Sequence, residues 1–241
     1  MDLEKKDTHN YIDVTLFKDF YFNKNLGLPT IIKEYRRLEE SLVTNQYLAC
    51  ITAKVDHLQR IEYQYGSELY NRLLFKITDL LKNLKSNDFR DDDIFVVDMV
   101  ELDTFVIFLS TPREKRTQLL DHLEEIADRV RINLEKAIFK LFYPYLKEFC
   151  RPSIGYSLII KNPMISNLRL LIQLIKNSRE MGVFLSNKRD FISKYQLQKI
   201  IIERRIYTVF QPIVDIKTLE IIGHEALSRG PEGTEFDNPL M

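Results

Sequence analysis

The sequence has only two cysteines, no net charge and no long apolar run. Cys50 and Cys150 lie far apart, in or beside apolar runs, which predicts buried free thiols and excludes a disulfide framework. The 35 basic and 35 acidic residues balance, so no overall field attracts a nucleic acid polymer or an anionic membrane. No apolar run approaches the ~20 residues of a membrane span, and Met1–Glu4 does not open a secretory signal. We therefore expect a cytoplasmic protein without a membrane segment.

The residues from Ile94 to Leu109 predict a β-hairpin. Two nearly continuous apolar runs flank the tripeptide Glu101-Leu102-Asp103, and such runs joined by a short polar segment are typical of paired strands. Because the runs are continuous rather than alternating, both faces of the sheet should be covered. This buried, central hairpin presents Glu101 and Asp103 at its tip, where we expect the functional site.

The rest of the chain alternates helical and strand patterns. Helices are predicted over 30–43, 113–142 and 168–181, with another broken near Tyr65-Gly66-Ser67. A polar, acidic loop is expected over 83–93. Strands are predicted over 47–55, 153–160 and 183–185, with Gly182 ending the preceding helix. This order predicts an α/β fold with a central mixed sheet of about five strands and helices on both faces.

Four segments, in this order and spacing, resemble the GGDEF (diguanylate cyclase) family over about residues 20–186. They are the opening turn Asn25–Pro29, the helical segment from Val55 to Leu74, the signature position Glu101-Leu102-Asp103-Thr104-Phe105, and the strand Ser153-Ile154-Gly155-Tyr156. The family joins two GTP molecules into cyclic di-GMP. The resemblance therefore implies its α/β fold and a nucleotide site at the hairpin tip.

The same resemblance implies that the cyclase site is degenerate. The chemistry needs carboxylates to hold divalent metal at the triphosphate, and glycines that let backbone amides approach phosphate. The matching positions hold Lys54, Asp56, Glu101, Leu102, Asp103 and Thr104. Lys54 stands where the first metal-binding carboxylate belongs, and Glu101 stands where a glycine belongs. A cation in the metal position and an anion in the phosphate position predict that no residue of this signature is catalytically functional.

The guanine-reading positions leave an alternative open. Where the family has an Asn and an Asp, this chain has Glu62 and Asn71, in exchanged order. A carboxylate can accept from the N1–H and N2–H of guanine, so Glu62, Asn71 and Asp56 are candidates for nucleotide binding. The other interpretation is two solvated helix residues. The sequence Arg90-Asp91-Asp92-Asp93 matches the family's product-binding pattern, but three adjacent acids disfavour a dianionic ligand, and we predict a solvated loop.

Residues 206–241 resemble the opening of an EAL domain, the cyclic di-GMP phosphodiesterase family. Phe210–Asp215, Gly223–Arg229 and Gly230–Gly233 stand at that family's spacing. The resemblance implies that Glu225 is a metal ligand and that Gln211, Leu227 and Arg229 contact the dinucleotide. Mg or Mn is implied for a complete EAL domain. We expect no cofactor for this chain, because it holds only the first two strands of a barrel with about eight.

These patterns predict an N-terminal extension (1–16), a degenerate GGDEF-like domain (17–187), a linker helix (188–205) and a truncated EAL N-terminus (206–241). The favoured hypothesis is a catalytically inactive regulatory domain that passes a signal to an EAL phosphodiesterase domain. No activity is expected for this chain, while a full-length parent would hydrolyse cyclic di-GMP. A GTP-binding allosteric sensor and a dimerisation or interaction module stay open, with GTP, cyclic di-GMP or a second copy as the partner.

Overall fold

The computed structural model describes residues 20–98, 101, 103–110, 119–146 and 150–237. The chain divides into two compact units, Met1–Ser186 and Asn187–Met241. Within the described residues, no helix combines the length and the apolar character needed to cross a membrane.

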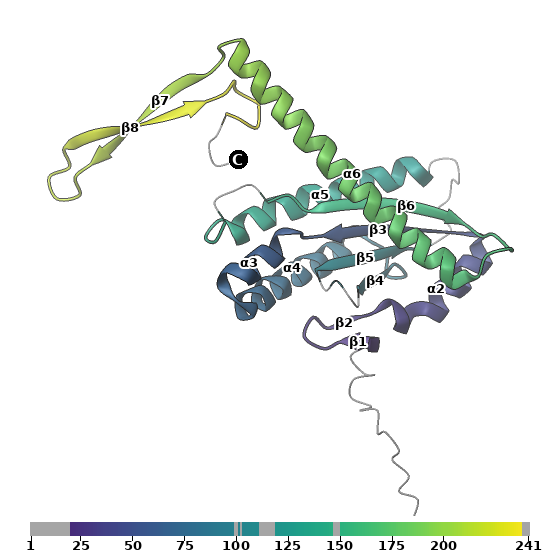
Figure 1. Ribbon diagram of the computed structural model, residues 1–241. Helices are drawn as coiled ribbons and strands as arrows, with labels where there is room; N and C mark the ends of the chain where they lie inside the picture. Colours follow the sequence, from purple (N-terminus) through teal and green to yellow (C-terminus); the bar gives the residue numbers. More distant parts are fainter. Residues whose placement is uncertain (1–19, 99–100, 102, 111–118, 147–149, 238–241) are drawn as a thin grey trace, which may run out of the picture. The chain divides into compact units, whose positions relative to one another are not determined.

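The first unit is built on a four-stranded antiparallel sheet with the strand order β4-β5-β3-β6 (Figure 1). Its strands are β3 (Tyr47–Lys54), β4 (Ile94–Val97), β5 (Thr104–Leu109) and β6 (Ser153–Ile160). The two-residue strands β1 (Phe22–Asn23) and β2 (Leu28–Pro29) pair separately, and a parallel bridge joins Thr30 to Val97. The β-branched and aromatic residues of β3, β4 and β5 explain why these segments form the buried strands.

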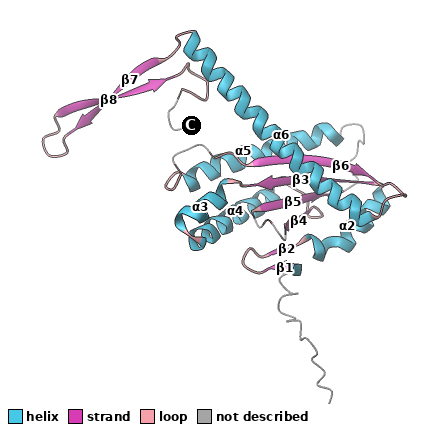
Figure 2. Ribbon diagram, viewed as in Figure 1, coloured by secondary structure: helices cyan, strands magenta, loops and turns pink. Residues whose placement is uncertain are grey.

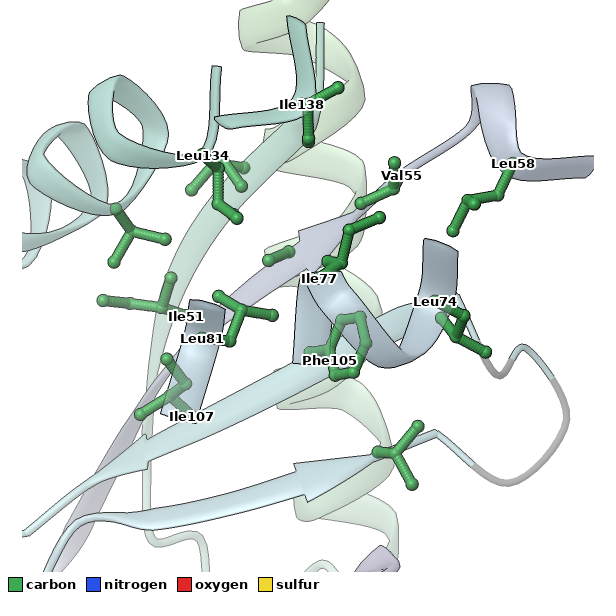
Figure 3. Close-up of a cluster of buried hydrophobic side chains, with 14 of the residues drawn as sticks. Ile51, Val55, Leu58, Leu74, Ile77, Leu81, Phe105, Ile107, Leu134 and Ile138 are labelled. Atoms are coloured by element: carbon green, nitrogen blue, oxygen red, sulfur yellow. The ribbon is translucent and has the colours of Figure 1, made fainter. Parts of the chain in front are cut away.

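Helices cover both faces of the sheet, as predicted (Figure 2). One face packs against α3 (His57–Tyr65), α4 (Ser67–Asp88) and α5 (Leu119–Phe142), and the other against α2 (Ile31–Asn45) and the first part of α6 (Asn167–Ile202). Because side chains alternate along a strand, Ile51 joins the first core and Cys50 the second. Figure 3 shows the first core, where Phe105 and Ile107 of β5 lie with side chains from the helices.

Most predicted elements are confirmed, with different ends. The helix predicted over 30–43 is α2, the strand predicted over 153–160 is β6, and the break near Gly66 separates α3 from α4. Gly66 has φ +86°, a conformation that favours glycine. The loop predicted over 83–93 is wrong at its start, because α4 continues to Asp88. Residues 113–118 of the predicted long helix lie outside the described residues.

The predicted strand at 183–185 is wrong, and so is the helix end at Gly182. Both lie inside α6, which is helical from Asn167 to Ile202. Among the described residues, the main sheet therefore has four strands rather than about five, and β6 is an edge strand. Gly182 is needed for close packing: a Cβ built there would lie 2.9 Å from the backbone nitrogen of Gly155, and one built on Gly155 would lie 1.8 Å from the carbonyl oxygen of Ser178.

The hairpin predicted over 94–109 is present, but it is not central in the sheet. β5 lies inside the sheet and β4 lies at its edge. Strand β4 ends at Val97, earlier than its apolar run suggests, whereas β5 spans its predicted run, so the turn between the strands includes Asp98 as well as Glu101 and Asp103.

The second unit contains the C-terminal part of α6 and a hairpin of β7 (Tyr207–Val214) and β8 (Ile221–Arg229). The helix expected over 188–205 is not separate, because α6 continues through it to Ile202. The turn between the strands is closed by Asp215, whose Oδ1 accepts from the backbone N–H of Lys217 at 2.7 Å. Every residue of β7 is exposed within the described chain.

Candidate functional site

The turn between β4 and β5, here called the signature turn (Asp98, Glu101, Asp103 and Thr104), is held by hydrogen bonds. The backbone N–H of Asp98 donates to the carbonyl of Thr104 at 2.8 Å, and the N–H of Thr104 donates to the carbonyl of Glu101 at 2.9 Å. The Glu101 N–H also donates to Oδ1 of Asp98 at 2.8 Å. These bonds fix the backbone that carries the Glu101 and Asp103 carboxyl groups.

Lys54 brings a positive charge to this turn. It is the last residue of β3 and lies in register with Thr104 on one side and Ser153 on the other. Its Nζ is 3.3 Å from Oε2 of Glu101 and 3.7 Å from Oδ1 of Asp56. Burial acts to lower the pKa of Lys54, but the hydrogen bond and charge of Glu101, with the charges of Asp56 and Asp103, raise it overall. The ammonium therefore stays protonated.

Another charged residue of this region, Asp103, is buried. It is only 1% exposed, and its Oδ2 accepts from Nε2 of Gln59 at 3.3 Å. Burial is the main reason that the pKa of Asp103 is raised; Lys54 opposes the rise, and Glu101 and Asp56 add to it. The carbonyl of Asp103 accepts from the N–H of Val55 at 3.2 Å. The Asp103 carboxyl group is therefore buried at the end of the sheet and is not exposed for binding a metal ion or nucleotide.

The remaining cyclase candidates are also engaged in the fold. Oδ2 of Asp56 accepts from the hydroxyl of Ser153 at 2.8 Å. Thr104 is fully buried, and its hydroxyl contacts the Glu101 carboxylate at 3.3 Å. Phe105 is fully buried in the core. Leu102 lies outside the described residues.

Glu62 and Asn71, the guanine candidates, come from different helices. Oε1 of Glu62, in α3, accepts from the hydroxyl of Ser67 at 2.7 Å, across the break before α4. Asn71 is exposed on α4. Burial, then the charges of Asp103 and Glu62, raise the pKa of Tyr70 to about 12. No hydrogen bond joins Glu62 to Asn71 among the bonds of the described residues.

The residues at the signature turn do not fit the divalent metal that the cyclase resemblance implies. The Lys54 ammonium already lies against the carboxylates of Glu101 and Asp56, and a second cation would be repelled at these distances. Within the described parts of the chain, no group of three or more His, Cys, Asp or Glu side chains is arranged to hold a metal ion.

Three polar residues that we did not single out connect the site to α6. Arg179 of α6 forms an ion pair and hydrogen bond with Asp98 of the signature turn. At the preceding residue of α6, the buried hydroxyl of Ser178 lies 2.9 Å from that of Thr52 in β3. These contacts join elements far apart in the sequence, so no local pattern could have indicated them.

The loop predicted to be solvated around Arg90–Asp93 contains one buried carboxylate. Asp93 is 1% exposed, and it accepts backbone N–H groups from Arg90 at 3.0 Å and Ser110 at 2.5 Å. The prediction is therefore wrong for Asp93, which closes the far end of the β4–β5 hairpin. A pocket of about 190 Å³ lies at that end, and none of the predicted site residues lines it.

In the second unit, the strand register brings the EAL candidates onto one face. Gln211 of β7 lies directly opposite Glu225 of β8. Because alternate residues of a strand share a face, Leu227 and Arg229 lie on the same face as Glu225. Gln211 and Glu225 are exposed, whereas Leu227 and Arg229 are half-buried. Among the described residues, Glu225 belongs to no group of three or more His, Cys, Asp or Glu side chains that could hold a metal ion.

No protein-family model matches the chain, and no curated protein matches it. Similar solved structures include the Vibrio cholerae LapD S helix-GGDEF-EAL protein bound to c-di-GMP (12% identity, 91% of this chain and 51% of that one, TM-score 0.45) and the same protein in its apo form (13%, 91% and 50%, TM-score 0.49). Another is diguanylate cyclase SiaD in complex with its activator SiaC from Pseudomonas aeruginosa (16%, 73% and 62%, TM-score 0.48). The chain thus spans about half the length of the LapD structures, and TM-scores below 0.5 assign it no function.

Proposed function

We propose that the chain is a catalytically silent regulatory module of cyclic di-GMP signalling, built on a GGDEF-like domain. The observation that carries this proposal is the ion pair of 3.3 Å between Lys54 and Glu101. The two residues stand where the sequence resemblance calls for a metal-binding carboxylate and for a glycine. The ammonium repels a divalent cation, the carboxylate repels a triphosphate, and each holds the other in place.

The anchoring of α6 supports a relay role for the module. Arg179 pairs with the signature turn, and Ser178 contacts β3 through Thr52. The same helix continues to Ile202, and the hairpin that follows resembles the opening of an EAL domain. In a protein with a complete EAL domain, a change at the signature turn would be passed along α6 to a phosphodiesterase, where Glu225 would help to hold Mg or Mn.

The first experiment tests catalysis directly. The chain is incubated overnight with millimolar Mg-GTP, and the nucleotides are separated by chromatography. We expect no cyclic di-GMP above a protein-free control, with an active diguanylate cyclase as the positive control. Formation of the product in many turnovers per protein molecule would overturn the proposal.

The second experiment separates a silent module from a GTP sensor. Calorimetric titration with Mg-GTP is expected to give no saturable heat up to millimolar ligand. Saturation at micromolar GTP that is lost in Glu62→Ala and Asn71→Ala would replace this function by a GTP sensor. Glu68→Ala is the matched control, because Glu68 is an exposed acid on the same helix as Asn71.

A further inference from the structure

The β6 edge of the main sheet is open over half of its length. Along β6, Ser153–Gly155 are buried, Tyr156–Ile159 are half-buried, and the side chain of Ile160 is 68% exposed. No described strand pairs with this outer edge, since residues 183–185 belong to α6. The open edge segment is therefore Tyr156–Ile160.

The hydrogen-bonding direction of each residue in this segment follows from one bond. The N–H of Lys161 donates to the carbonyl of Gln46 at 2.8 Å, which continues the register of β6 with β3. In an antiparallel ladder, bonded and non-bonded pairs alternate. The polar backbone groups of Tyr156, Leu158 and Ile160 therefore point away from β3, and their side chains share the face that α5 covers.

The open edge segment carries none of the features that usually protect an edge strand. Charged residues, proline and bulges keep edges from pairing with other chains. β6 reads Ser-Ile-Gly-Tyr-Ser-Leu-Ile-Ile, without charge or proline, and its register with β3 is regular throughout. β4, the opposite edge strand, has four residues and is bridged at Val97 by Thr30.

We propose that the open edge segment pairs with the same segment of a second copy, antiparallel and about a twofold axis at Leu158. This register sets Leu158 opposite Leu158 of the other copy, and Tyr156 opposite Ile160. All six outward backbone N–H groups would then be bonded, three from each chain. The pairing also sets an aromatic ring against a β-branched side chain, a favourable cross-strand pair, and covers the exposed Ile160.

A second copy fits this edge because the segment is complementary to itself. A twofold interface requires that residue i meets residue j and that j meets i. Centring on Leu158 satisfies this with the open edge segment alone, while the buried Ile154 stays outside the contact. The uncharged strand sets no like charges against each other. The result is a continuous eight-stranded sheet across the dimer, from four strands in each copy.

Cysteine cross-linking of the full chain tests both the pairing and its register. Hydrogen-bonded antiparallel partners have Cα atoms about 5.5 Å apart, within disulfide range. Leu158→Cys should therefore form a symmetric disulfide dimer on mild oxidation. Ile160→Cys alone should not, but it should cross-link to Tyr156→Cys when the two variants are mixed. Cys50 and Cys150 are buried, and the wild-type chain controls for them.

Mass measurement by light scattering gives an independent readout. The wild-type mass is expected to rise with concentration from 28.7 kDa towards twice that value. Leu158→Pro removes an outward N–H without breaking the β3 ladder, and Ile160→Lys adds an edge charge; both should stay monomeric, with circular dichroism confirming the fold. Met164→Lys, at a residue that is 90% exposed outside the strand, is the matched control and should still dimerise.

Two results would overturn the proposal. One is a monomer at every concentration together with no Leu158→Cys cross-link. The other is a dimer that survives in both folded edge variants, because its interface would then lie elsewhere, for example on the exposed apolar hairpin of the second unit.

Discussion

Replacing Gly155 by alanine should detach α6 from the sheet. The added Cβ would lie 1.8 Å from the carbonyl oxygen of Ser178 and 2.4 Å from the backbone nitrogen of Gly182. Non-bonded carbon contacts need about 3.5 Å, so α6 must retreat by roughly 1.5 Å. Both obstructing atoms belong to backbone, and a change of rotamer cannot relieve the overlap.

The free-energy cost of this displacement comes from the packing strain and from the hydrogen bond that it breaks. Overpacking of this kind costs about 1–3 kcal/mol, and separating the buried Thr52 and Ser178 hydroxyls, now 2.9 Å apart, adds about 1 kcal/mol. Alanine regains about 0.5–1 kcal/mol of backbone entropy relative to glycine in a strand. The net expected loss of unfolding free energy for Gly155→Ala is therefore about 1–3.5 kcal/mol.

Urea denaturation followed by circular dichroism measures this loss through the midpoint and the slope. Gly182→Ala should lose less, because its Cβ contacts are 2.9–3.3 Å and helix propensity returns about 1 kcal/mol. Gly223→Ala is the control, since a Cβ there meets nothing within 4 Å. A Gly155→Ala variant that matches Gly223→Ala in midpoint and slope would refute the packing of α6 on β6.

Three further changes test the network around the site. Arg179→Ala should raise amide hydrogen exchange in the signature turn, because Asp98 loses its ion pair with α6, whereas Lys176→Ala in the same helix should not; equal exchange in both would contradict the link. The pKa of Asp103 is raised above 3.8, so the folded chain keeps a proton that the unfolded chain has lost, and stability falls as the pH rises through that interval. Asp103→Asn should therefore show a smaller fall of unfolding free energy between about pH 4 and pH 7, and an identical fall would refute this assignment. Ser178→Ala should cost about 1–3 kcal/mol by leaving the buried Thr52 hydroxyl unpaired, and Thr52→Val combined with it should cost less than the sum of the two single changes; strict additivity would show that the hydroxyls do not interact.

Local sequence patterns were sufficient to predict those elements in which the burial of the side chains and their intrinsic propensity favour the same structure. The apolar residues of β3, β5 and β6 leave little alternative to a strand, and the helical period of α2 is regular. Gly66 marked the break between α3 and α4, because its positive φ is a local requirement that glycine meets. In these segments, sequence neighbours alone determine the structure.

The prediction of a strand at 183–185 is wrong because tertiary packing overrides two local features of this segment. Val183 and Phe184 favour strands, and a glycine before them suggests a helix end. In the structure Gly182 is a contact point with Gly155, so the helix passes through it. Val183 and Phe184 remain 51% and 60% exposed on the surface of α6. The requirement for glycine comes from a strand almost thirty residues earlier, which periodicity cannot reveal.

At the candidate site, too, the sequence alone does not reveal how the charged residues interact. Considered alone, Lys54 and Glu101 each predict the loss of one function by comparison with the GGDEF pattern that the sequence resembles. In the structure the two departures are partners, 3.3 Å apart. Either one without the other would leave an uncompensated charge near the buried Asp103: Glu101 would add a negative charge to it, and Lys54 would lose its nearest counter-charge. In the silent module that we propose, the pair therefore joins the two residues that would remove catalytic chemistry into one structural contact, so that the proposed silence of the site and the stability of the turn would have the same cause.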